Sequence, residues 1–395
     1  MTWPRVPLGE IFTIARGGSP RPIDAFITDD PDGVNWIMIG DASEGSKYIS
    51  STKKRIRKEG VSRSRAVKSG DFLLTNSMSF GHPYILDTSG CIHDGWLVLS
   101  PQDGKVNRDF FYYMLGSPFV YAEFERLAAG AVVKNLNSEL VRGVRVPLPP
   151  LAEQRRIADI LDKADAIRRK RKEAIALTEE LLRSAFLEMF GDPVTNPKGW
   201  PTRSVGELCE LIVDCVNRTA PITSQATPYK MIRTTNVKAG KVLLDDVQFV
   251  ERETFDTWNR RCVPRRNDVL LTREAPVGEA GLLRSDDKVF LGQRLMLYRT
   301  NSALLLPEYL VQSFLGPHLQ AQFDTHGSGS TVKHLPLRVC RAFAVRLPPI
   351  ALQQRYAAFA RGVHETTCDT NVALDSAEEL FKSLVARAFS GGLSA

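Results

Sequence analysis

The chain contains one internal duplication, and this repeat limits the possible folds more than any other feature of the sequence. Four blocks return in the same order: Trp3-Pro4 as Trp200-Pro201, Asp71 to Thr75 as Asp268 to Thr272, Pro149 to Ala152 as Pro348 to Ala351, and Glu179 to Ser184 as Glu378 to Ser383. The first two blocks return after 197 residues and the last two after 199, so a two-residue insertion accounts for the difference. Because a repeated sequence folds into repeated structural units, we expect two similar halves.

Each copy has the pattern of an α+β domain followed by a long helix. Short β-rich runs such as Phe72 to Leu74 alternate with turns of Gly, Pro, Asn and Ser. Each domain ends in a Pro-Pro pair, which suits the first turn of a helix because proline fixes φ and lacks an N–H. We therefore divide the chain into a globular domain at 1–150, a long helix at 151–191, a second globular domain at 192–349 and a second long helix at 350–395.

Both long helices carry a row of residues at alternating spacings of three and four. The rows are Ile160, Ala164, Ile167, Arg171, Ala174, Thr178, Leu181 and Ala185 in the first helix, and Phe359, Val363, Thr366, Thr370, Ala373, Ala377, Leu380 and Leu384 in the second. This spacing predicts that the helices pair as a coiled coil, and antiparallel pairing would give a pseudo-twofold arrangement because each helix follows its own domain. We expect Arg171 and Thr370, at the midpoints of the rows, to form a polar layer that sets the register. The alternative is that each helix packs only on its own domain.

The composition is that of a soluble protein with a polyanionic partner. The length of 395 residues exceeds the size at which a single core stops growing. Lys and Arg number 52 against 45 Asp and Glu, which gives a pI of about 9.1 and favours a partner such as nucleic acid. The N-terminus has no basic region followed by an apolar run, no apolar stretch is long enough to span a membrane, and the cysteines are scattered. We therefore expect a cytoplasmic protein with reduced thiols.

The sequence lacks the motifs that would indicate catalysis. It has no glycine-rich phosphate loop, no dinucleotide-binding glycine pattern, no histidine pair of a zinc protease and no nucleophile elbow. It also lacks the Asn-Pro-Pro-aromatic tetrapeptide that amino-methyltransferases place around a flipped base. The histidines and cysteines show no metal-ligand spacing. We predict that the chain is not an enzyme and holds no metal.

Basic residues are concentrated in corresponding parts of the two globular domains. The first domain carries Lys53, Lys54, Arg55, Arg57, Lys58, Arg63, Arg65 and Lys68, and the second carries Arg252, Arg260, Arg261, Arg265 and Arg266. Arg63 and Lys68 correspond to Arg260 and Arg265 at the spacing of 197 residues. Because such side chains neutralise phosphates and release counterions, we interpret them as positioning contacts to duplex DNA. The alternative is a charged face that contacts only solvent.

Loops and strand ends supply candidates for reading bases, a task that needs fork-shaped or amide side chains on exposed segments. The candidates are Gly18, Ser19 and Arg21 in one loop, Asn76 and Ser77 after one strand, Arg273 after its counterpart, Arg233, and Lys134 and Lys333 after tracts of small residues. The two strand ends carry different side chains, Thr75-Asn76 against Thr272-Arg273, in matching surroundings. Two domains that read different sequences on one scaffold would show this pattern.

The junction between domain and helix resembles that of a known family. Pro147-Leu148-Pro149-Pro150-Leu151-Ala152-Glu153-Gln154-Arg155-Arg156-Ile157 is similar to the end of a target-recognition domain in the specificity subunits of Type I restriction-modification systems. The ending SLVARAFSGGL, from Ser383 to Leu393, resembles their usual C-terminus, and the resemblance covers the whole chain. The second copy departs from the pattern because Leu352 stands where the first copy has Glu153, so equivalent partner contacts at the two helix starts are not implied.

The resemblance implies that each globular domain recognises one half of a gapped, asymmetric duplex DNA sequence and that the helices act as a spacer. Two methyltransferase subunits would supply S-adenosylmethionine and adenine-N6 methylation, and two restriction subunits would supply ATP- and Mg-dependent translocation and cleavage in phage defence. This chain would bind no cofactor. The alternatives are the specificity module of another restriction or phage-defence assembly, and a coiled-coil scaffold protein whose basic domains bind something other than DNA.

Overall fold

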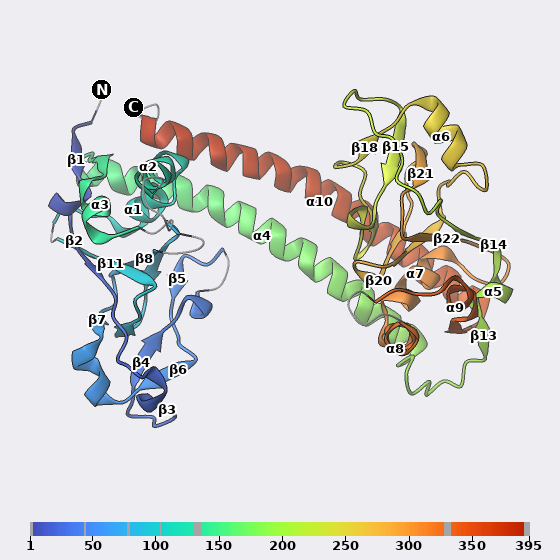
Figure 1. Cartoon of the computed structure of the whole chain (residues 1–395), viewed down its shortest axis with the longest axis horizontal. Coiled ribbons are helices and arrows are strands. Elements are labelled where there is room, and N and C mark those ends of the chain that lie inside the picture. The colour runs from blue at the N-terminus through green and yellow to red at the C-terminus, as the bar shows by residue number, and fades with distance from the viewer. Residues whose placement is uncertain are drawn as a thin grey trace. The chain divides into compact units, whose positions relative to one another are not determined.

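The computed structural model describes residues 3–42, 45–76, 80–102, 104–128, 136–327 and 333–390. The chain divides into two compact units, one formed by Met1–Lys172 with Val372–Ala395 and the other by Glu173–Asn371 (Figure 1). Each unit contains a globular domain together with part of each long helix, α4 (Leu151–Phe190) and α10 (Ile350–Ser390). The α+β class with two similar domains, each followed by a long helix, is confirmed.

The first unit is built from two five-stranded sheets, of order β2-β11-β8-β9-β5 and β3-β6-β4-β10-β7, and a short pair, β1 with β12. The strands are β1 (Arg5–Pro7), β2 (Phe12–Arg16), β3 (Ile27–Thr28), β4 (Val34–Ile37), β5 (Tyr48–Ile49), β6 (Lys54–Ile56), β7 (Arg65–Val67), β8 (Phe72–Thr75), β9 (Pro83–Leu86), β10 (Gly90–Ile92), β11 (Trp96–Pro101) and β12 (Arg145–Pro147). The helices before α4 are α1 (Arg108–Leu115), α2 (Pro118–Ala128) and α3 (Ser138–Gly143), with short turns at η1 (Leu8–Glu10), η2 (Ile23–Ala25), η3 (Ile39–Asp41) and η4 (Lys58–Arg63).

The second unit repeats this plan with a six-stranded sheet, β14-β22-β19-β20-β17-β16, a three-stranded sheet, β18-β15-β21, and the short pair β13 with β23. Its strands are β13 (Thr202–Ser204), β14 (Cys209–Asp214), β15 (Tyr229–Ile232), β16 (Val237–Lys238), β17 (Gly240–Val242), β18 (Gln248–Phe249), β19 (Val269–Arg273), β20 (Val277–Leu282), β21 (Lys288–Leu291), β22 (Leu295–Thr300) and β23 (Ala344–Arg346). Its helices are α5 (Val205–Leu208), α6 (Arg252–Trp258), α7 (Pro307–Leu315), α8 (Pro317–His326) and α9 (Leu337–Ala342), with the turn η5 (Thr234–Asn236).

The five-stranded sheet β2-β11-β8-β9-β5, which we call the inner sheet of the first unit, corresponds to the first five strands of the six-stranded sheet, the inner sheet of the second unit, where β16 is additional. Leu74 of β8 lies opposite Leu97 of β11, and Leu271 of β19 lies opposite Met296 of β22. Every residue of β8 is buried, as its continuous apolar run predicts for a strand covered on both faces. In the first unit the outer sheet, with β3, β4 and β6, lies on the side of the inner sheet away from α1 and α2 (Figure 1). The inner sheet therefore separates the outer sheet from the helices.

The main core of the first unit lies between its inner sheet, its short helices and parts of both long helices. Phe12 of β2 meets Phe111 of α1 edge to face, with ring centroids 5.1 Å apart. The same cluster includes Ile157 and Leu161 of α4 and Phe389 of α10, all buried. Burial of such side chains stabilises a fold by about 2 to 3 kcal/mol each. This core therefore attaches the globular domain to both long helices.

The main core of the second unit is formed in the same way from aromatic side chains. Phe186 of α4 stacks on Tyr309 of α7 at 5.2 Å and meets Tyr356 of α10 edge to face at 5.4 Å. Phe190, at the end of α4, contacts the same two tyrosine rings. Aromatic pairs in these geometries add about 0.5 to 1.5 kcal/mol each beyond the area that they bury.

A buried glutamine fixes the start of each long helix. Gln154 is 1% exposed, accepts the N–H of Asn107 at 2.8 Å and donates to the carbonyl oxygens of Lys105 and Pro149. Gln353, 199 residues later, accepts the N–H of Leu306 at 2.9 Å and donates to two carbonyl oxygens in the same way. The side chain that the two copies share at this junction is therefore the glutamine.

The difference between the copies at the neighbouring position has a local explanation. Glu153 pairs with Arg156 on the helix surface at 2.7 Å, whereas Leu352 packs beside the core of the second unit. Since neither residue takes part in the glutamine network, the missing acid leaves the junction intact.

Within each unit the parts of α4 and α10 pair in opposite directions. In the first unit Arg171 donates to the carbonyl oxygen of Ala373, and Arg168 lies over the ring of Phe381 at 4.7 Å. In the second unit the hydroxyl oxygens of Thr178 and Thr367 lie 3.3 Å apart, and Tyr356 donates to the carbonyl oxygen of Leu182 at 3.4 Å. Residue numbers rise along one helix as those of the contacted residues fall along the other, so the expected antiparallel pairing is present in both units.

The seam of this pairing differs in part from the predicted row. Ile167, Leu181, Phe359 and Leu380 have 38–55% of their surface exposed, so our expectation that they lie in the seam was wrong. The contacts are displaced by one residue at Arg168, Leu182 and Phe381, because large apolar residues such as Leu181 and Leu182 occupy two adjacent rows. Tyr356, which also contacts α4, continues the predicted row three residues before Phe359. Of the other predicted pairing residues, Ala164 is buried, and Ile160, Val363 and Leu384 are partly buried.

The predicted polar layer of Arg171 and Thr370 takes another form. The Arg171 guanidinium binds the backbone oxygen of Ala373, and the Thr370 hydroxyl donates to the carbonyl oxygen of Thr366 within its own helix. A threonine in a helix commonly bonds in this way, which directs its hydroxyl proton into its own helix.

Candidate nucleic-acid interface

The first candidate edge lies where β2 and β8 end beside the turn that precedes β11. Ser19 donates to the Asp94 carboxylate at 3.0 Å, and Arg16 donates to the Asp94 carbonyl oxygen at 3.1 Å. Burial alone would raise the pKa of Asp94, but the hydrogen bonds from Ser19 and the backbone, together with the charges of His93 and Arg16, outweigh burial and lower this pKa. A side chain on Gly17 would place its Cβ 2.0 Å from the carbonyl oxygen of His93, so only glycine allows this approach. The loop 17–19 is thus held against the turn 93–95.

Asn76, predicted to read a base, is placed differently. Its side chain is only 3% exposed, and its amide nitrogen donates to the Asp94 carbonyl oxygen at 2.7 Å. An amide buried in such a bond is not presented to a base, so the predicted role is corrected to support of the turn 93–95.

The second unit builds the same edge with the same backbone hydrogen bonds. The N–H of Asn76 binds the carbonyl oxygen of Gly95, and the N–H of Arg273 binds that of Arg294 at 2.8 Å. The carbonyl oxygen of Asn76 accepts from Leu136, and that of Arg273 accepts from Leu335. The scaffold is therefore repeated although its side chains differ.

Arg294 gives the second edge its exposed charge. Its backbone has a φ of 71°, a left-handed conformation that residues other than glycine rarely adopt. Its guanidinium pairs with Glu274 at 3.2 Å and remains 49% exposed. Strained conformations of this kind concentrate at functional positions.

A cavity of about 380 Å³ lies beside Arg294 in the second unit. Its lining includes the guanidinium groups of Arg218, Arg233 and Arg294, the amides of Gln248 and Gln293, and the ring of Trp258. Arg233, a sequence candidate, has a buried Nε without a hydrogen-bond partner. Fork-shaped donors, amides and an aromatic face are the groups with which proteins recognise bases and phosphates.

The basic run of the first domain is exposed and uncompensated. Its eight residues lie on or directly beside the outer-sheet strands β6 and β7 and the turn η4 between them, and all eight side chains face solvent. Within the described ranges, none of the eight forms an ion pair, although Arg63 lies over the ring of Phe26 at 5.8 Å. Unpaired cations side by side produce a strong local positive potential.

The basic residues of the second domain are partly neutralised. Arg261 pairs with Asp214 at 2.6 Å, and Arg266 pairs with Asp286 at 2.7 Å. Among the described residues Arg260 and Arg265, the counterparts of Arg63 and Lys68, form no ion pair and are exposed. The positive surface is therefore stronger in the first domain.

The other sequence candidates are scattered. Arg21 is exposed at the end of the 17–19 loop, and Gly18 lies near the backbone of Arg63. Arg273 donates to the carbonyl oxygen of Leu335 at 2.9 Å, and Lys333 pairs with Asp324 on the surface. Ser77 and Lys134 lie outside the described residues.

The described residues hold no group of three or more His, Cys, Asp or Glu side chains suited to a metal ion. Nor does any described helix combine the length and the apolar character required to cross a bilayer.

A family model, the Type I restriction modification DNA specificity domain, matches residues 1–177 and 197–368. The chain belongs to this family of specificity subunits. The two matched segments together cover most of the chain and coincide with its two copies. Members of the family contribute DNA specificity and are not themselves the catalytic subunits of their systems.

Several relatives match this chain over nearly its whole length. The specificity subunit of the Type I restriction enzyme EcoBI of Escherichia coli is 23% identical over 427 residues, which cover 100% of this chain and 87% of that protein. The solved Type I restriction-modification S subunit of M. genitalium aligns with a TM-score of 0.58 at 13% identity, covering 98% of this chain and 96% of that one. A chain from a structural study of complex assembly in the type I R-M system gives a TM-score of 0.53 at 20% identity, with 99% and 98% covered. These structures share the fold.

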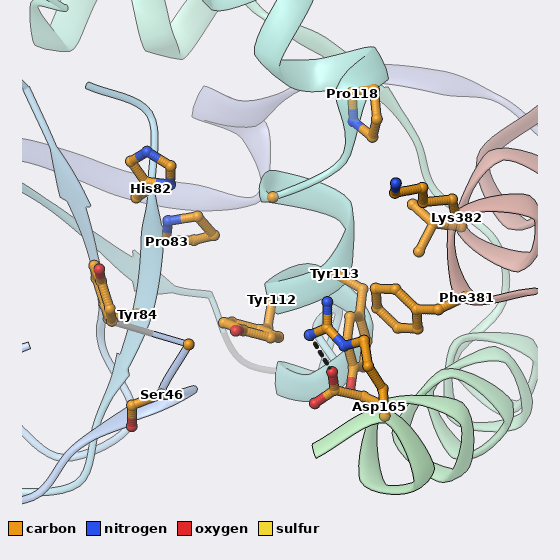
Figure 2. Close-up of a pocket in the computed structure, with 14 residues that line it drawn as sticks. Ser46, His82, Pro83, Tyr84, Tyr112, Tyr113, Pro118, Asp165, Phe381 and Lys382 are labelled. Carbon is orange, nitrogen blue, oxygen red and sulfur yellow. Dashed lines mark hydrogen bonds and ion pairs between the residues drawn. The ribbon is translucent and has the colours of Figure 1, made fainter. Parts of the chain in front are cut away.

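The specificity subunit also has a cavity beside the paired helices in each unit. The first, of about 280 Å³, lies between α1 and the two long helices, with Tyr112 and Phe381 on its wall (Figure 2). The second, of about 740 Å³, is lined at the corresponding positions by Val311 and Leu182. The repeat thus places a hollow at the corresponding position in both units.

Sequence reasoning missed several residues of the specificity subunit's edges. Arg16 and Asp94 in the first unit, and Arg218, Gln293 and Arg294 in the second, were not among the candidates. A signal was present, because Asp94-Gly95 and Gln293-Arg294 are 199 residues apart and replace glycine by arginine.

Proposed function

We propose that this specificity subunit binds a gapped, asymmetric duplex DNA target, with one half of the target read by each globular domain. The observation that carries the proposal is the repeated edge: Asn76 and Arg273 make equivalent backbone bonds, whereas Asp94-Gly95 and Gln293-Arg294 present different side chains. Since hydrogen-bonding side chains carry sequence information, two unlike edges read two unlike half-sites.

Phosphate contacts supply the affinity in this proposal. The exposed, unpaired cations of β6, η4 and β7 suit the DNA backbone of the first half-site. The three arginines around the cavity of the second unit would both position the duplex and read its bases.

The chain directs partner subunits in the same proposal. Two methyltransferase subunits and two restriction subunits would act at the bound target, using S-adenosylmethionine, ATP and Mg, while this chain binds none of these cofactors. The hollows beside the paired helices, present once in each unit, support two equivalent docking positions for the methyltransferase subunits. A location in the cytoplasm follows from this role.

Substitution of Arg294 tests the division of the target. The complex of this chain with its methyltransferase is assembled with wild-type chain or Arg294→Ala, and methylation is measured on a library of target sequences. We expect relaxed discrimination at one or two positions of a single half-site, worth about 1 to 3 kcal/mol for each base that Arg294 reads.

Arg338→Ala is the matched control, because Arg338 is an exposed arginine of the same domain on α9 and is not among the DNA-binding candidates. It should leave the base preferences of both half-sites unchanged. A loss of discrimination in both half-sites with Arg294→Ala would contradict one-domain, one-half-site reading.

A further inference from the structure

Lys47 is a lysine in an unusual environment. It directly precedes β5 at the edge of the inner sheet of the first unit, and it is 7% exposed. Lysine is among the residues most rarely buried, and a buried ammonium group is strongly destabilising unless it is paired.

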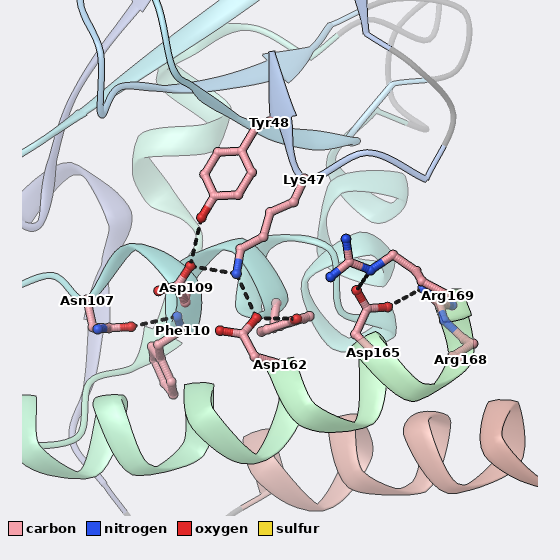
Figure 3. Close-up of polar contacts among 10 residues, drawn as sticks. Lys47, Tyr48, Asn107, Asp109, Phe110, Asp162, Asp165, Arg168 and Arg169 are labelled. Atoms are coloured by element: carbon pink, nitrogen blue, oxygen red, sulfur yellow. Dashed lines mark hydrogen bonds and ion pairs between the residues drawn. The ribbon is translucent and has the colours of Figure 1, made fainter. Parts of the chain in front are cut away.

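The Lys47 ammonium group joins three segments of the first unit (Figure 3). Its Nζ lies 2.5 Å from the Asp109 carboxylate on α1 and 2.7 Å from the Asp162 carboxylate on α4. The Tyr113 hydroxyl donates to the same Asp162 oxygen at 2.6 Å, and the Tyr48 hydroxyl donates to Asp109 at 3.4 Å. One cation therefore links the sheet edge, the short helix and the long helix.

The surroundings keep Lys47 charged. Burial alone would lower its pKa, but the hydrogen bonds to Asp109 and Asp162 and the charges of these carboxylates together outweigh burial and raise the pKa above the ordinary value. The rings of Tyr112 and Tyr113 lie 5.4 and 5.0 Å from Nζ, which adds cation–π attraction. Without Lys47 the two carboxylates would face each other without a counter-charge.

At the equivalent junction of the second unit, the long helix carries a residue of opposite charge. Glu308 corresponds to Asp109, and Arg361 corresponds to Asp162, each 199 residues later. Arg361 donates directly to Glu308 at 2.8 Å, and Glu308 is 5% exposed. Lys241, on the strand that corresponds to β5, pairs instead with Glu179 of α4 at 3.1 Å.

We infer that Lys47 is a positioning residue that locks the first globular domain onto α4, and that the two domain–helix junctions carry charge sets that are not interchangeable. In the first junction the carboxylate of the short helix faces a carboxylate of the long helix, and a lysine bridges the two. In the second junction the carboxylate of the short helix pairs directly with an arginine of the long helix. The second domain placed on the first helix would bring Glu308 against Asp162 in place of its partner Arg361. Each domain is thereby matched to its own helix despite the shared scaffold.

The inference rests on the proposed function only where it concerns DNA. There, the lock would hold the edge formed by residues 17–19 and 93–95 at a fixed angle to α4. A domain that is free to rock on its helix presents its base-reading edge in many orientations, and binding selects one of them at the expense of affinity.

The test replaces the lock of the first unit by that of the second. Spin labels are placed at two exposed positions, Ser62 in the outer sheet and Arg155 on α4, in a full-length chain with Cys209, Cys262 and Cys368 replaced by serine. The distance distribution is then measured for Lys47→Met and for Lys47→Met combined with Asp162→Arg. Lys163→Met, an exposed lysine next to Asp162, is the control.

We expect Lys47→Met to broaden the distance distribution at least twofold and the double variant to restore it, because the new arginine pairs with Asp109 as Arg361 pairs with Glu308. Lys163→Met should match the wild type. An unchanged distribution with Lys47→Met, or no restoration by the double variant, would overturn the inference. If Lys47→Met does not fold, two other variants decide the outcome. The double variant should keep the wild-type distribution, and Asp162→Asn should broaden it, but by less than twofold.

Methylation separates this inference from the proposed function. With the methyltransferase partner, Lys47→Met should lower methylation of target DNA at least tenfold, and the double variant should restore it. A distance distribution that broadens while methylation stays unchanged would leave the lock standing and would count against the proposal that the first domain must be held in place to read DNA.

Discussion

Gln154 and Gln353 show how a single buried side chain determines where a domain joins its helix. Each amide satisfies three backbone groups that would otherwise be buried without partners. The proline pair in the sequence indicated this junction. The difference that the sequence showed there, Glu153 against Leu352, lies one position before the glutamine that makes the buried hydrogen bonds. A one-letter pattern does not reveal which of two adjacent polar residues turns inward.

We predict that Gln154→Ala lowers the free energy of unfolding by about 2 to 4 kcal/mol, because it leaves the Asn107 N–H and two carbonyl oxygens without partners. Urea unfolding of the full chain measures this change. Glu153→Ala is the control and should lower stability by less than about 1 kcal/mol, because it removes only a surface ion pair. Equal effects of the two substitutions would contradict the role given to the glutamine.

His364 makes the stability of the second unit depend on pH. Burial, with Arg284 and Lys241 nearby, lowers its pKa from 6.5 to about 4. The unfolded chain therefore binds a proton between these values that the folded chain does not, so stability is lost as the pH falls from 6.5 to 4. Because the ring is only half-buried, we expect His364→Gln to remove about 1 kcal/mol of this loss. The free energy of unfolding of the wild type and of His364→Gln is measured at pH 7 and at pH 4.5. An equal loss of stability in the two proteins between these pH values would refute this.

At the scale of elements, the sequence predicted the two long helices and their bounds closely but not the side that each helix turns to the other. The proline pairs and the glycine after Phe190 mark the ends of α4, and that glycine has a φ of 77°. The seam was displaced by one residue because Leu181 and Leu182 both carry apolar side chains on adjacent rows. Only tertiary contacts, such as that of Phe186 with Tyr356, select between the rows.

The corrected seam predicts a contrast between neighbouring residues of α4. Phe186→Ala removes a buried ring that contacts Tyr309 and Tyr356 and should lower stability by about 3 to 5 kcal/mol. Leu181→Ala removes a side chain from a residue that is 48% exposed and should change stability by less than about 1 kcal/mol. Denaturant unfolding distinguishes the two, and the reverse order would restore the row predicted from the sequence.

The base-reading edges, which are formed by strand ends and turns, were also predicted only in part. The sequence indicated the strand ends through the contrast of Asn76 with Arg273, yet Asn76 faces inward and the exposed arginine of the second edge is Arg294. The turn that holds Arg294 lies before a different strand, β22, and joins this edge only when β22 pairs with β19. Long-range pairing of this kind has no local sequence signal.

The uncompensated basic run predicts the salt dependence of DNA binding. Replacing Lys53, Lys54, Arg55 and Arg57 by glutamine should reduce the slope of log affinity against log salt by about 0.9 for each phosphate that the protein no longer neutralises. Replacing Arg261 and Arg266 by glutamine should change the slope less, because both already pair with aspartates. Duplex binding by the methyltransferase complex at several salt concentrations measures both, and equal slopes for the two variants would contradict this view of the surface.

At the scale of the whole molecule, the duplication predicted most of what the structure contains. Two domains, two helices and two equivalent junctions follow from blocks that recur after 197 and 199 residues. What it could not predict is how the copies diverge: one junction uses Lys47 between two carboxylates, and the other uses Arg361 against Glu308. Repeats reveal a shared scaffold, whereas the chemistry that distinguishes the copies depends on which side chains meet in space.

The most direct test of the central claim is a map of adenine methylation across the host genome with and without this gene. The account predicts that deletion removes methylation from one gapped, asymmetric motif and that the Arg294→Ala chain restores methylation with altered bases in only one half of that motif. Loss of an ungapped or palindromic motif, or no loss although the partner methyltransferase is present and active, would contradict it.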